Sequence, residues 1–349
     1  NCELMAVVKA DGYGHDAIVV SKYAVKGGAS QLGVATLREG IKLRSSGIKT
    51  PILVLGNLHS KSDLILCFKN NLMPTISSIR ECLICNNIGK HFGSRFSLHL
   101  KVDTGMSRLG FENDLFVQQF KKIKSFENIC IKGLYSHLSS ADEINALDPN
   151  SSAQLQRKKF QELLNQIKID KKDNIKFHLA NSAGMLLGKD FQFDMVRVGL
   201  SIYGYNPLIN LNSELSLKPS LFLKVKVAFI RTIDKGVGVS YGSKFVSSRK
   251  TKLAVLSIGY ADGIIRSLSG KINVIHNKKI YPQVGSITMD QMMVDITDSN
   301  EIKVGTTMLL LGSDGDKSIS PVEWATKSNT ITWEILCSFK NRIPRVQVD

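Results

Sequence analysis

The chain has 349 residues, enough to bury a large core and more typical of two domains than of one. Its 46 basic and 30 acidic residues give a net charge of +16, but the lysines are dispersed on helix-like stretches with acidic neighbours, which argues against nucleic-acid binding. We expect no membrane span and no signal peptide, and the six scattered cysteines favour a reducing cytoplasm over a disulfide framework.

Short apolar runs alternate with amphipathic stretches from the N-terminus to about residue 204. Eight runs are candidate strands: Leu4–Ala10, Gln31–Thr36, Pro51–Gly56, Leu72–Ile76, Arg95–Val102, Ile131–Leu138, Lys176–Asn181 and Val196–Tyr203. Helix-like sequence fills most of the gaps between them. This alternation predicts a parallel (β/α)8 barrel of the TIM type, an α/β fold, over residues 1–210.

The first of these runs ends in the most informative residue of the chain, Lys9. The run before it indicates a buried strand, and Gly12 and Gly14 predict a tight turn directly after it. A lysine at such a strand end is partly withdrawn from water, and its neutral amine is the nucleophile that forms a Schiff base with an aldehyde cofactor. Taken alone, the pattern is better explained by a lysine that reaches into solvent. The motifs that follow Lys9 in the sequence favour the Schiff-base lysine over the solvent-exposed one.

Polar residues collect near the predicted carboxyl ends of the other strands. They are the segment Lys101 to Arg108, His137, the pair Asn181-Ser182, and Arg197, which comes early in the last strand. The chemistry of (β/α)8 barrels takes place at this end of the barrel. The distribution therefore predicts an active site there.

A C-x-x-C spacing joins Cys82 and Cys85. The stretch around them is helix-like, and no second cysteine pair is present that could complete a zinc site. We therefore interpret both as half-buried helical thiols and expect no metal.

Beyond about Asn206, apolar or alternating runs are separated by short turns. These runs are Val225–Ile230, Gly236–Phe245, Lys252–Ile258, Lys271–Ile275, Gln291–Ile296 and Thr306–Leu311. The first long amphipathic stretch of this half is Pro321–Cys337. The pattern predicts a second, mostly antiparallel β domain over residues 211–349.

Eight motifs follow one another across both halves: Ala6–His15, Lys101–Gly110, Ser136–Leu138, His178–Ala183, Val196–Gly199, Val239–Gly242, Gly259–Gly263 and Met289–Gln291. This ordered series resembles alanine racemase, a fold-type III pyridoxal-phosphate enzyme. The resemblance implies a cytoplasmic racemase that interconverts L-alanine and D-alanine for peptidoglycan. It also implies a homodimer with shared active sites and no nucleic-acid or membrane partner.

The resemblance implies two catalytic bases. Lys9 carries the cofactor and acts on one face of the substrate. Tyr241 matches the second base, which the partner subunit supplies from its β domain. A phenol is a weak base at neutral pH unless nearby cations stabilise the phenolate. Taken alone, Tyr241 is better explained as a strand tyrosine with a solvated hydroxyl.

The cofactor-binding residues also follow from the resemblance. Arg197 faces the pyridine nitrogen, and His178 supports that arginine. His137 lies near the phenolic side of the cofactor. The phosphate is expected at Tyr13, Ser182, Gly199 and Leu200, bordered by Asn181.

The substrate side follows in the same way. Arg108 matches the residue that pairs with the cofactor's phenolic oxygen and with the substrate carboxylate. Met289 and Asp290 resemble residues of the substrate-carboxylate side that the partner subunit contributes. Lys101 matches a position that often carries a carbamate, an anion able to hold Arg108 in place. Tyr260 resembles an entrance tyrosine, and a structural role explains it nearly as well.

The sequence departs from the family pattern in several places. Trp333 stands where a tyrosine usually contacts the phosphate, and Ser286 and Thr288 stand where arginine and cysteine are common. The segment that precedes the cofactor strand in the family, which supplies a strand to the β domain, is expected to be missing.

Two alternatives remain open. One is a broad-specificity amino-acid racemase that accepts serine or lysine on the same scaffold. The other is a non-catalytic pyridoxal-phosphate-binding protein. The β domain with Tyr241 argues against this second alternative, because such proteins usually consist of the barrel alone.

Overall fold

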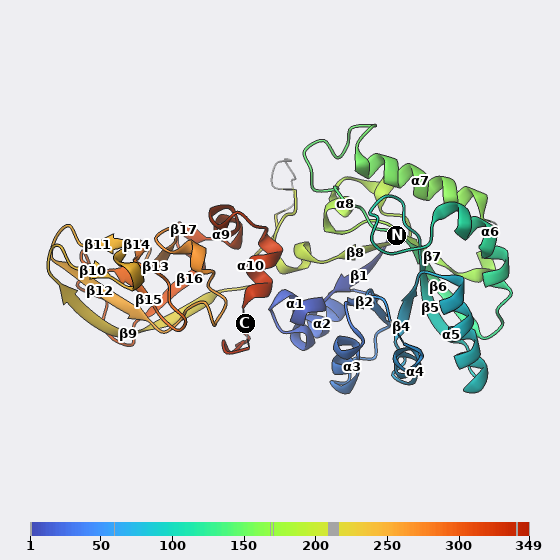
Figure 1. The fold of residues 1–349 in the computed structure, drawn as a ribbon, viewed down its shortest axis with the longest axis horizontal. Helices are drawn as coiled ribbons and strands as arrows, with labels where there is room; N and C mark the ends of the chain where they lie inside the picture. Colours follow the sequence, from blue (N-terminus) through green and yellow to red (C-terminus); the bar gives the residue numbers. More distant parts are fainter. Residues whose placement is uncertain are drawn as a thin grey trace. The chain divides into compact units, whose positions relative to one another are not determined.

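The computed structural model describes residues 2–58, 60–167, 169, 171–208, 216–339 and 341–348. The chain divides into two compact units (Figure 1). The first contains Asn1–Gly12 and Asp16–Lys218, and the second contains Tyr13–His15 and Pro219–Asp349. The expected domain boundary between residues 210 and 211 falls within 209–215, outside the described residues.

Eight parallel strands form the centre of the first unit. They are β1 (Glu3–Val7), β2 (Gln31–Val34), β3 (Ile52–Val54), β4 (Met73–Ile76), β5 (Phe96–Lys101), β6 (Ile129–Tyr135), β7 (Lys176–His178) and β8 (Met195–Val198). Their spatial order is β7-β6-β5-β4-β3-β2-β1-β8. The amide of Arg197 in β8 donates to the carbonyl of Ala180, just after β7, over 3.0 Å. The predicted α/β fold with a parallel (β/α)8 barrel is confirmed, and the eight strands form a near-barrel.

Helices follow most of these strands, as the alternation predicts. They are α2 (Ala17–Lys26), α3 (Leu37–Ser45), α4 (Lys61–Lys69), α5 (Ile79–His91), α6 (Asn113–Lys124), α7 (Ser152–Gln166) and α8 (Ser182–Leu186). Three short 3₁₀ segments are η1 (Lys171–Asp173), η2 (Lys189–Phe191) and η3 (Leu200–Tyr203). The N-termini of α3, α4, α5 and α7 are fixed by Thr36, Ser60, Ser78 and Ser151, whose hydroxyls accept backbone amides of the first turn.

Alternation along the strands separates the side chains that pack on the helices from those that face the barrel interior. Side chains of one parity form the large cluster with the surrounding helices, including Ala6, Val8, Leu98, Leu100, Val196 and Val198. Side chains of the other parity form a small inner cluster of Met5, Leu53, Met73, Tyr135 and Met195. Successive side chains point to opposite faces of a strand. Lys101 in β5 and Arg197 in β8 have the opposite parity to the neighbours that pack on the helices, so their strands direct them to the barrel interior.

The second unit is mostly antiparallel β structure, as predicted. Its strands are β9 (Leu223–Ile233), β10 (Gly238–Val239), β11 (Phe245–Val246), β12 (Thr251–Leu256), β13 (Asn273–His276), β14 (Lys279–Val284), β15 (Met292–Asp295), β16 (Thr307–Asp314) and β17 (Lys317–Ile319). Seven of them follow the order β13-β14-β15-β12-β9-β16-β17, and β13 also pairs with β16. That last pairing closes six strands into a ring. Two further 3₁₀ segments are η4 (Tyr241–Ser243) and η5 (Arg266–Leu268).

The expected helical stretch Pro321–Cys337 is two helices, α9 (Pro321–Ser328) and α10 (Thr332–Ser338). Asn329 ends α9 in the left-handed conformation, with φ 57°, and its amide donates to Thr326. Asparagine is one of the few residues besides glycine that adopts this conformation readily at a helix end. The amphipathic pattern continues across the break, which explains why the sequence suggests a single helix.

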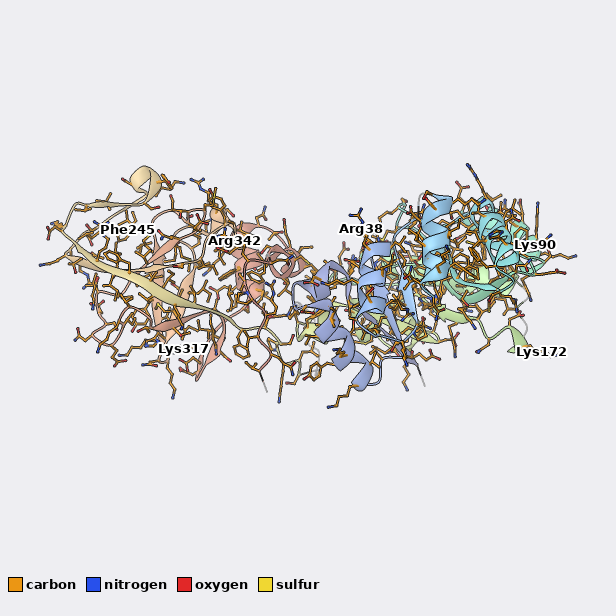
Figure 2. All side chains as sticks on the ribbon, turned by 90° about the horizontal axis from the view of Figure 1, so that it is seen from below. Arg38, Lys90, Lys172, Phe245, Lys317 and Arg342 are labelled. Atoms are coloured by element: carbon orange, nitrogen blue, oxygen red, sulfur yellow. The ribbon has the colours of Figure 1, made fainter. Side chains whose placement is uncertain are left out.

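The structure bears on three expectations from the composition, which concern the basic side chains, membrane spans and the cysteines. Exposed basic side chains such as Arg38, Lys90 and Lys172 lie on separate elements (Figure 2). Across the described ranges, no helix is both long and apolar enough to cross a membrane. Cys82 and Cys85 are fully buried in α5 rather than half-buried, and burial raises the pKa of Cys82 to about 12. Thiols in such surroundings are unreactive at neutral pH.

Candidate active site

Lys9 begins a left-handed turn at the carboxyl end of β1. The segment is α1 (Lys9–Tyr13), and its φ/ψ angles are 53°/48° at Ala10, 52°/46° at Asp11 and 65°/43° at Gly12. This conformation costs residues other than glycine roughly 1–2 kcal/mol each. Backbone strain of this kind persists only where the surroundings hold it in place, and it concentrates at functional sites. The turn predicted after Lys9 is present, but it is a left-handed helical turn.

The carboxylate of Glu39 holds that turn. Its Oε1 accepts the amide of Ala10 over 2.8 Å, and its Oε2 accepts the amides of Ala35 and Thr36 over 2.7 and 3.0 Å. The Thr36 hydroxyl accepts the Glu39 amide in return, which completes a capping box at the N-terminus of α3. The start of α3 therefore fixes the backbone directly after Lys9. Sequence reasoning missed Glu39, although the T-x-x-E spacing was visible.

Glu39→Ala is expected to lower the free energy of unfolding by about 1–3 kcal/mol and to speed hydrogen exchange at the Ala10 amide. The matched control is Glu81→Ala. Glu81 accepts the amide of Ser77 beside a Ser78 cap at α5 but makes no bond to the Lys9 turn. Denaturant unfolding and amide exchange check both variants. Unchanged exchange at Ala10 in Glu39→Ala would show that the turn does not depend on this carboxylate.

Arg197 is the buried cation at the centre of the barrel interior, with 3% of its surface exposed. Its Nη1 donates to Nδ1 and the carbonyl oxygen of His178, over 2.9 and 3.0 Å. Its Nη2 donates to the Ser136 and Leu179 carbonyls and to Nδ1 of His137, over 2.7, 2.9 and 2.9 Å. Among the described residues none accepts a hydrogen bond from Nε.

Burial lowers the pKa of Arg197 to about 10, so the guanidinium stays charged at neutral pH. Burial, and secondly the charge of Arg197, lowers the pKa of His137 and of His178 well below the usual histidine value. Both imidazoles are therefore neutral acceptors for this cation. The Tyr135 ring face lies 5.0 Å from the guanidinium carbon and adds a cation–π contact.

Lys101 lies at the end of β5 with 6% of its surface exposed. Burial, followed by the charge of Arg197, lowers the pKa of Lys101 to about 8. Arg108 and Lys9 act on Lys101 in the same direction. The barrel mouth therefore gathers four cationic side chains, although Arg108 itself is exposed on its loop. Such a cluster favours an anionic ligand.

Apart from Tyr13, the residues predicted for phosphate binding lie between the end of β7 and the start of η3. The Ser182 hydroxyl accepts the amide of Gly199 over 2.9 Å, and the Asn181 side chain caps α8 through the amide of Gly184. Leu200 is buried and opens η3. Beside them, the buried Ser201 hydroxyl has no hydrogen-bond partner in the described part of the chain. A buried unpartnered hydroxyl at this place suits an anionic ligand.

The second unit carries the other predicted residues. Tyr13 belongs to this unit and is buried, and burial raises its pKa. Tyr241 is 72% exposed on η4. The Ser240 hydroxyl donates to the Ser286 carbonyl, and the Ser286 hydroxyl donates to the Tyr241 carbonyl, each over 2.8 Å. Sequence reasoning noted Ser286 only as a departure and missed that it holds the Tyr241 loop.

Met289 and Asp290 continue from this loop. The Tyr260 amide donates to the carbonyl of Thr288 over 3.0 Å, and the Ala261 amide donates to that of Met289 over 3.0 Å. Asp290 accepts from Arg342 over 2.9 Å. The segment from Ser286 to Asp290 therefore brings the predicted residues of this unit into one group of loops.

Comparison with known proteins agrees with this geometry. Residues 1–207 match the sequence profile of the alanine racemase N-terminal domain, and residues 221–347 match that of the C-terminal domain. The chain belongs to the alanine racemase family. An alanine racemase of Prochlorococcus marinus is 50% identical over 347 residues, which cover 99% of this chain and 90% of the relative.

Solved alanine racemase structures show the same fold. That of Clostridium difficile superposes with a TM-score of 0.90 at 32% identity, covering 98% of this chain and 87% of the other. That of Bartonella henselae, described with covalently bound pyridoxal phosphate, gives 0.88 at 31% identity, covering 99% and 93%. The family motifs found in the sequence therefore lie on the fold of the solved alanine racemases.

Proposed function

We propose that this chain is a pyridoxal-phosphate-dependent alanine racemase. It is a cytoplasmic homodimer that interconverts L-alanine and D-alanine and supplies D-alanine for peptidoglycan. The observation that carries the proposal is Arg197, a buried guanidinium whose hydrogen-bond partners among the described residues are all neutral, in the same barrel interior as Lys9. Family membership and the neighbouring cations support it.

The residues of the first unit suit pyridoxal phosphate. A lysine amine binds its aldehyde, and Lys9 stands at the mouth of the barrel. Its ring nitrogen needs a donor, and Arg197 Nε is not engaged by any described residue. Its phosphate needs amides and hydroxyls, and the Ser201 hydroxyl lacks a partner within the described residues, beside Ser182. We propose that Asn181, Gly199 and Leu200 complete this phosphate site.

When bound, pyridoxal phosphate supplies the electron sink that acidifies the α-hydrogen of the amino acid. Lys9 Nζ removes or returns that proton on one face, and the hydroxyl of Tyr241 does so on the opposite face. Arg197 stays protonated at neutral pH, since its pKa is about 10, and donates a hydrogen bond to the ring nitrogen without giving up its proton. An unprotonated ring nitrogen limits electron withdrawal by the pyridine ring, which favours return of the proton to the α-carbon.

Charged groups at the barrel mouth orient the substrate. We propose that Arg108 pairs with the substrate carboxylate and His137 lies at the phenolic side of the cofactor. The partner subunit's contribution in this proposal is the loop group of Tyr241, Met289 and Asp290. The 72% exposure of Tyr241 supports this, because a base that serves a second subunit must lie on the surface of its own. Tyr13 adds a hydroxyl to the phosphate site.

The amine of Lys101 suits carbamylation, in which neutral lysine nitrogen bonds to the carbon of CO₂ and a proton is released. Lys101 is surrounded by cations, and burial keeps its pKa near 8. A carbamate would replace a repelling cation by an anion beside Arg108 and Arg197. We propose that this modification holds Arg108 in place.

Lys101→Met tests this through the pH dependence of stability. Unfolded lysine has a pKa of about 10.4. Between pH 8 and 10 the unfolded chain therefore binds more protons than the folded one, so the free energy of unfolding of the unmodified wild type rises with pH. In CO₂-free buffer, Lys101→Met is expected to be more stable than the wild type below pH 8, by up to about 3 kcal/mol, and equally stable near pH 10.

Bicarbonate provides the second arm of that experiment. It is expected to stabilise the wild type and to leave Lys101→Met unchanged. Lys90→Met replaces an exposed lysine of α5 and serves as the control without a pH-dependent difference. Identical unfolding curves for wild type and Lys101→Met at every pH, with and without bicarbonate, would contradict the proposed role of this lysine.

The experiment that tests the proposed function is a chirality-resolved assay of the purified protein loaded with pyridoxal phosphate. L-alanine and D-alanine are each expected to give the racemic mixture, while L-serine and L-lysine turn over more slowly. Preference for serine or lysine would support the broad-specificity racemase instead. Cofactor absorption without turnover of any amino acid would support a non-catalytic binding protein.

A further inference from the structure

Two fully buried histidines extend the hydrogen bonds of Arg197 into the barrel. His99 on β5 and His178 on β7 are each 0% exposed. Nδ1 of His99 lies 3.0 Å from Nε2 of His178, and Nδ1 of His178 lies 2.9 Å from Nη1 of Arg197. The three side chains therefore form one continuous row, of which only Arg197 faces the proposed cofactor site.

The arginine determines where each imidazole carries its proton. A guanidinium only donates, so Nδ1 of His178 must accept and the proton of this neutral ring must be on Nε2. His178 then donates to Nδ1 of His99, which must also carry its proton on Nε2. Burial, and secondly the charge of Arg197, lowers the pKa of His99 to about 3, so this ring is neutral as well.

The row ends inside the protein. Nε2 of His99 is buried and has no hydrogen-bond partner within the described residues. An unpartnered buried N–H is unfavourable and calls for an explanation. A row that stops at such a group has no exit for a proton, so it suits fixing the orientation of its members rather than conducting protons.

A glycine on the strand between them makes the histidine pair possible. A Cβ at Gly133 of β6 would lie 2.4 Å from Nδ1 of His99 and 3.0 Å from Nε2 of His178, the two atoms that share the hydrogen bond. The pairing of β5 with β6 also shifts register between Leu98 and His99. Strand glycines often mark such a close approach of other groups.

Tyr135 fixes the plane of the second imidazole. Its ring stacks on His178, with centroids 4.7 Å apart and an interplanar angle of 7°. The Thr75 hydroxyl donates to the Val54 carbonyl, so it accepts its second bond, of 2.7 Å, from the Tyr135 hydroxyl. With that hydroxyl anchored, His178 can neither tilt nor rotate freely.

We propose that His99 is a positioning residue of the racemase, which acts through His178 to hold Arg197 in the orientation that presents Nε to the cofactor, and that Gly133 provides the space for it. The positioning role of His99 rests on the proposed function, whereas the proton positions follow from the hydrogen bonds of this chain alone. His99 itself touches neither substrate nor cofactor.

The test is the proton position on His178, read from imidazole ¹⁵N chemical shifts of the full chain labelled at histidine. The chain has seven histidines, few enough for assignment by substitution. In the cofactor-free wild type, His178 and His99 are both expected as neutral rings protonated on Nε2. Detection of His178 protonated on Nδ1 would overturn the inference, whatever the activity.

Three variants separate positioning from simple destabilisation. His99→Leu removes the acceptor of the His178 Nε2 proton, so it is expected to change the ¹⁵N chemical shift of that nitrogen and to lower kcat for alanine about tenfold. His99→Asn places an oxygen near the lost Nδ1 and is expected to restore both. Gly133→Ala is expected to behave as His99→Leu, and Gly33→Ala, whose Cβ meets only Leu55 and Met5 side chains at 3.2 Å and Val7 beyond, serves as its control.

The outcomes remain distinguishable from failure of the proposed function. A wild type without racemase activity but with the expected ¹⁵N shifts contradicts the function and keeps the proton arrangement. Unchanged His178 shifts in His99→Leu, or equal losses in His99→Leu and His99→Asn, overturn the positioning role even if racemisation is confirmed.

Discussion

Lys9→Ala is expected to slow racemisation by at least about a thousandfold and to abolish the visible absorption of lysine-bound pyridoxal phosphate. The amine is both the covalent anchor and a base in the proposed mechanism, so its loss removes two functions at once. Absorption spectra of the purified protein and turnover of each alanine enantiomer check the result.

Lys9→Arg and Lys90→Ala provide the controls. Lys9→Arg keeps a cation at the end of β1 without a nucleophilic amine, so it is expected to be as inactive as Lys9→Ala. Lys90 is exposed on α5, and its replacement is expected to change neither spectrum nor turnover. A Lys9→Ala protein that still racemises alanine would remove this residue from the mechanism.

The location of Lys9 could be predicted because the local sequence marks the end of β1. An apolar run that ends in a lysine and a glycine-rich turn defines both the strand and its end. The same kind of reasoning located Lys101 and Arg197, which lie on apolar runs that form β5 and β8. These predictions depend on periodicity within single segments, which the sequence displays directly.

Contacts between distant segments were beyond such reasoning. The capping pattern around Glu39 predicts the start of a helix. It does not predict that the carboxylate also accepts the amide of Ala10, 29 residues away. His99 is one of several polar residues that alternate with apolar ones in its strand, and its partner His178 is 79 residues distant. The need for glycine at position 133 becomes evident only when both imidazole rings are known to lie beside it. Pairings of this kind depend on three-dimensional register rather than local pattern.

Local exceptions account for the missed elements of the second unit. β14 contains Pro282, which cannot donate to a strand ladder and makes the segment read as a turn. β17 has only three residues, two of them polar. β14 pairs with β13, and β17 pairs with β16. This pairing outweighs the weak intrinsic preference of each segment for strand conformation.

Tyr241→Phe is expected to slow alanine turnover by about 10²–10⁴-fold while the absorption of bound cofactor persists. The substitution removes only the hydroxyl, and the loop keeps its bonds because Ser286 donates to the backbone carbonyl of residue 241. With one base left, the α-hydrogen of a single enantiomer is expected to exchange with deuterated solvent without racemisation. Equal loss of cofactor binding and turnover would make Tyr241 a structural residue.

Mixing two inactive variants tests whether the partner subunit supplies this hydroxyl. A mixed dimer of Lys9→Ala and Tyr241→Phe chains contains one site with both bases intact if Tyr241 acts across the interface, and none if it acts within its own chain. Random association makes half of the dimers mixed with one active site of two, so co-expression is expected to restore about a quarter of wild-type activity. Activity no higher than that of the separate variants would place Tyr241 and Lys9 of the same chain in one site. The exposure of Tyr241 on its own unit would then need another explanation.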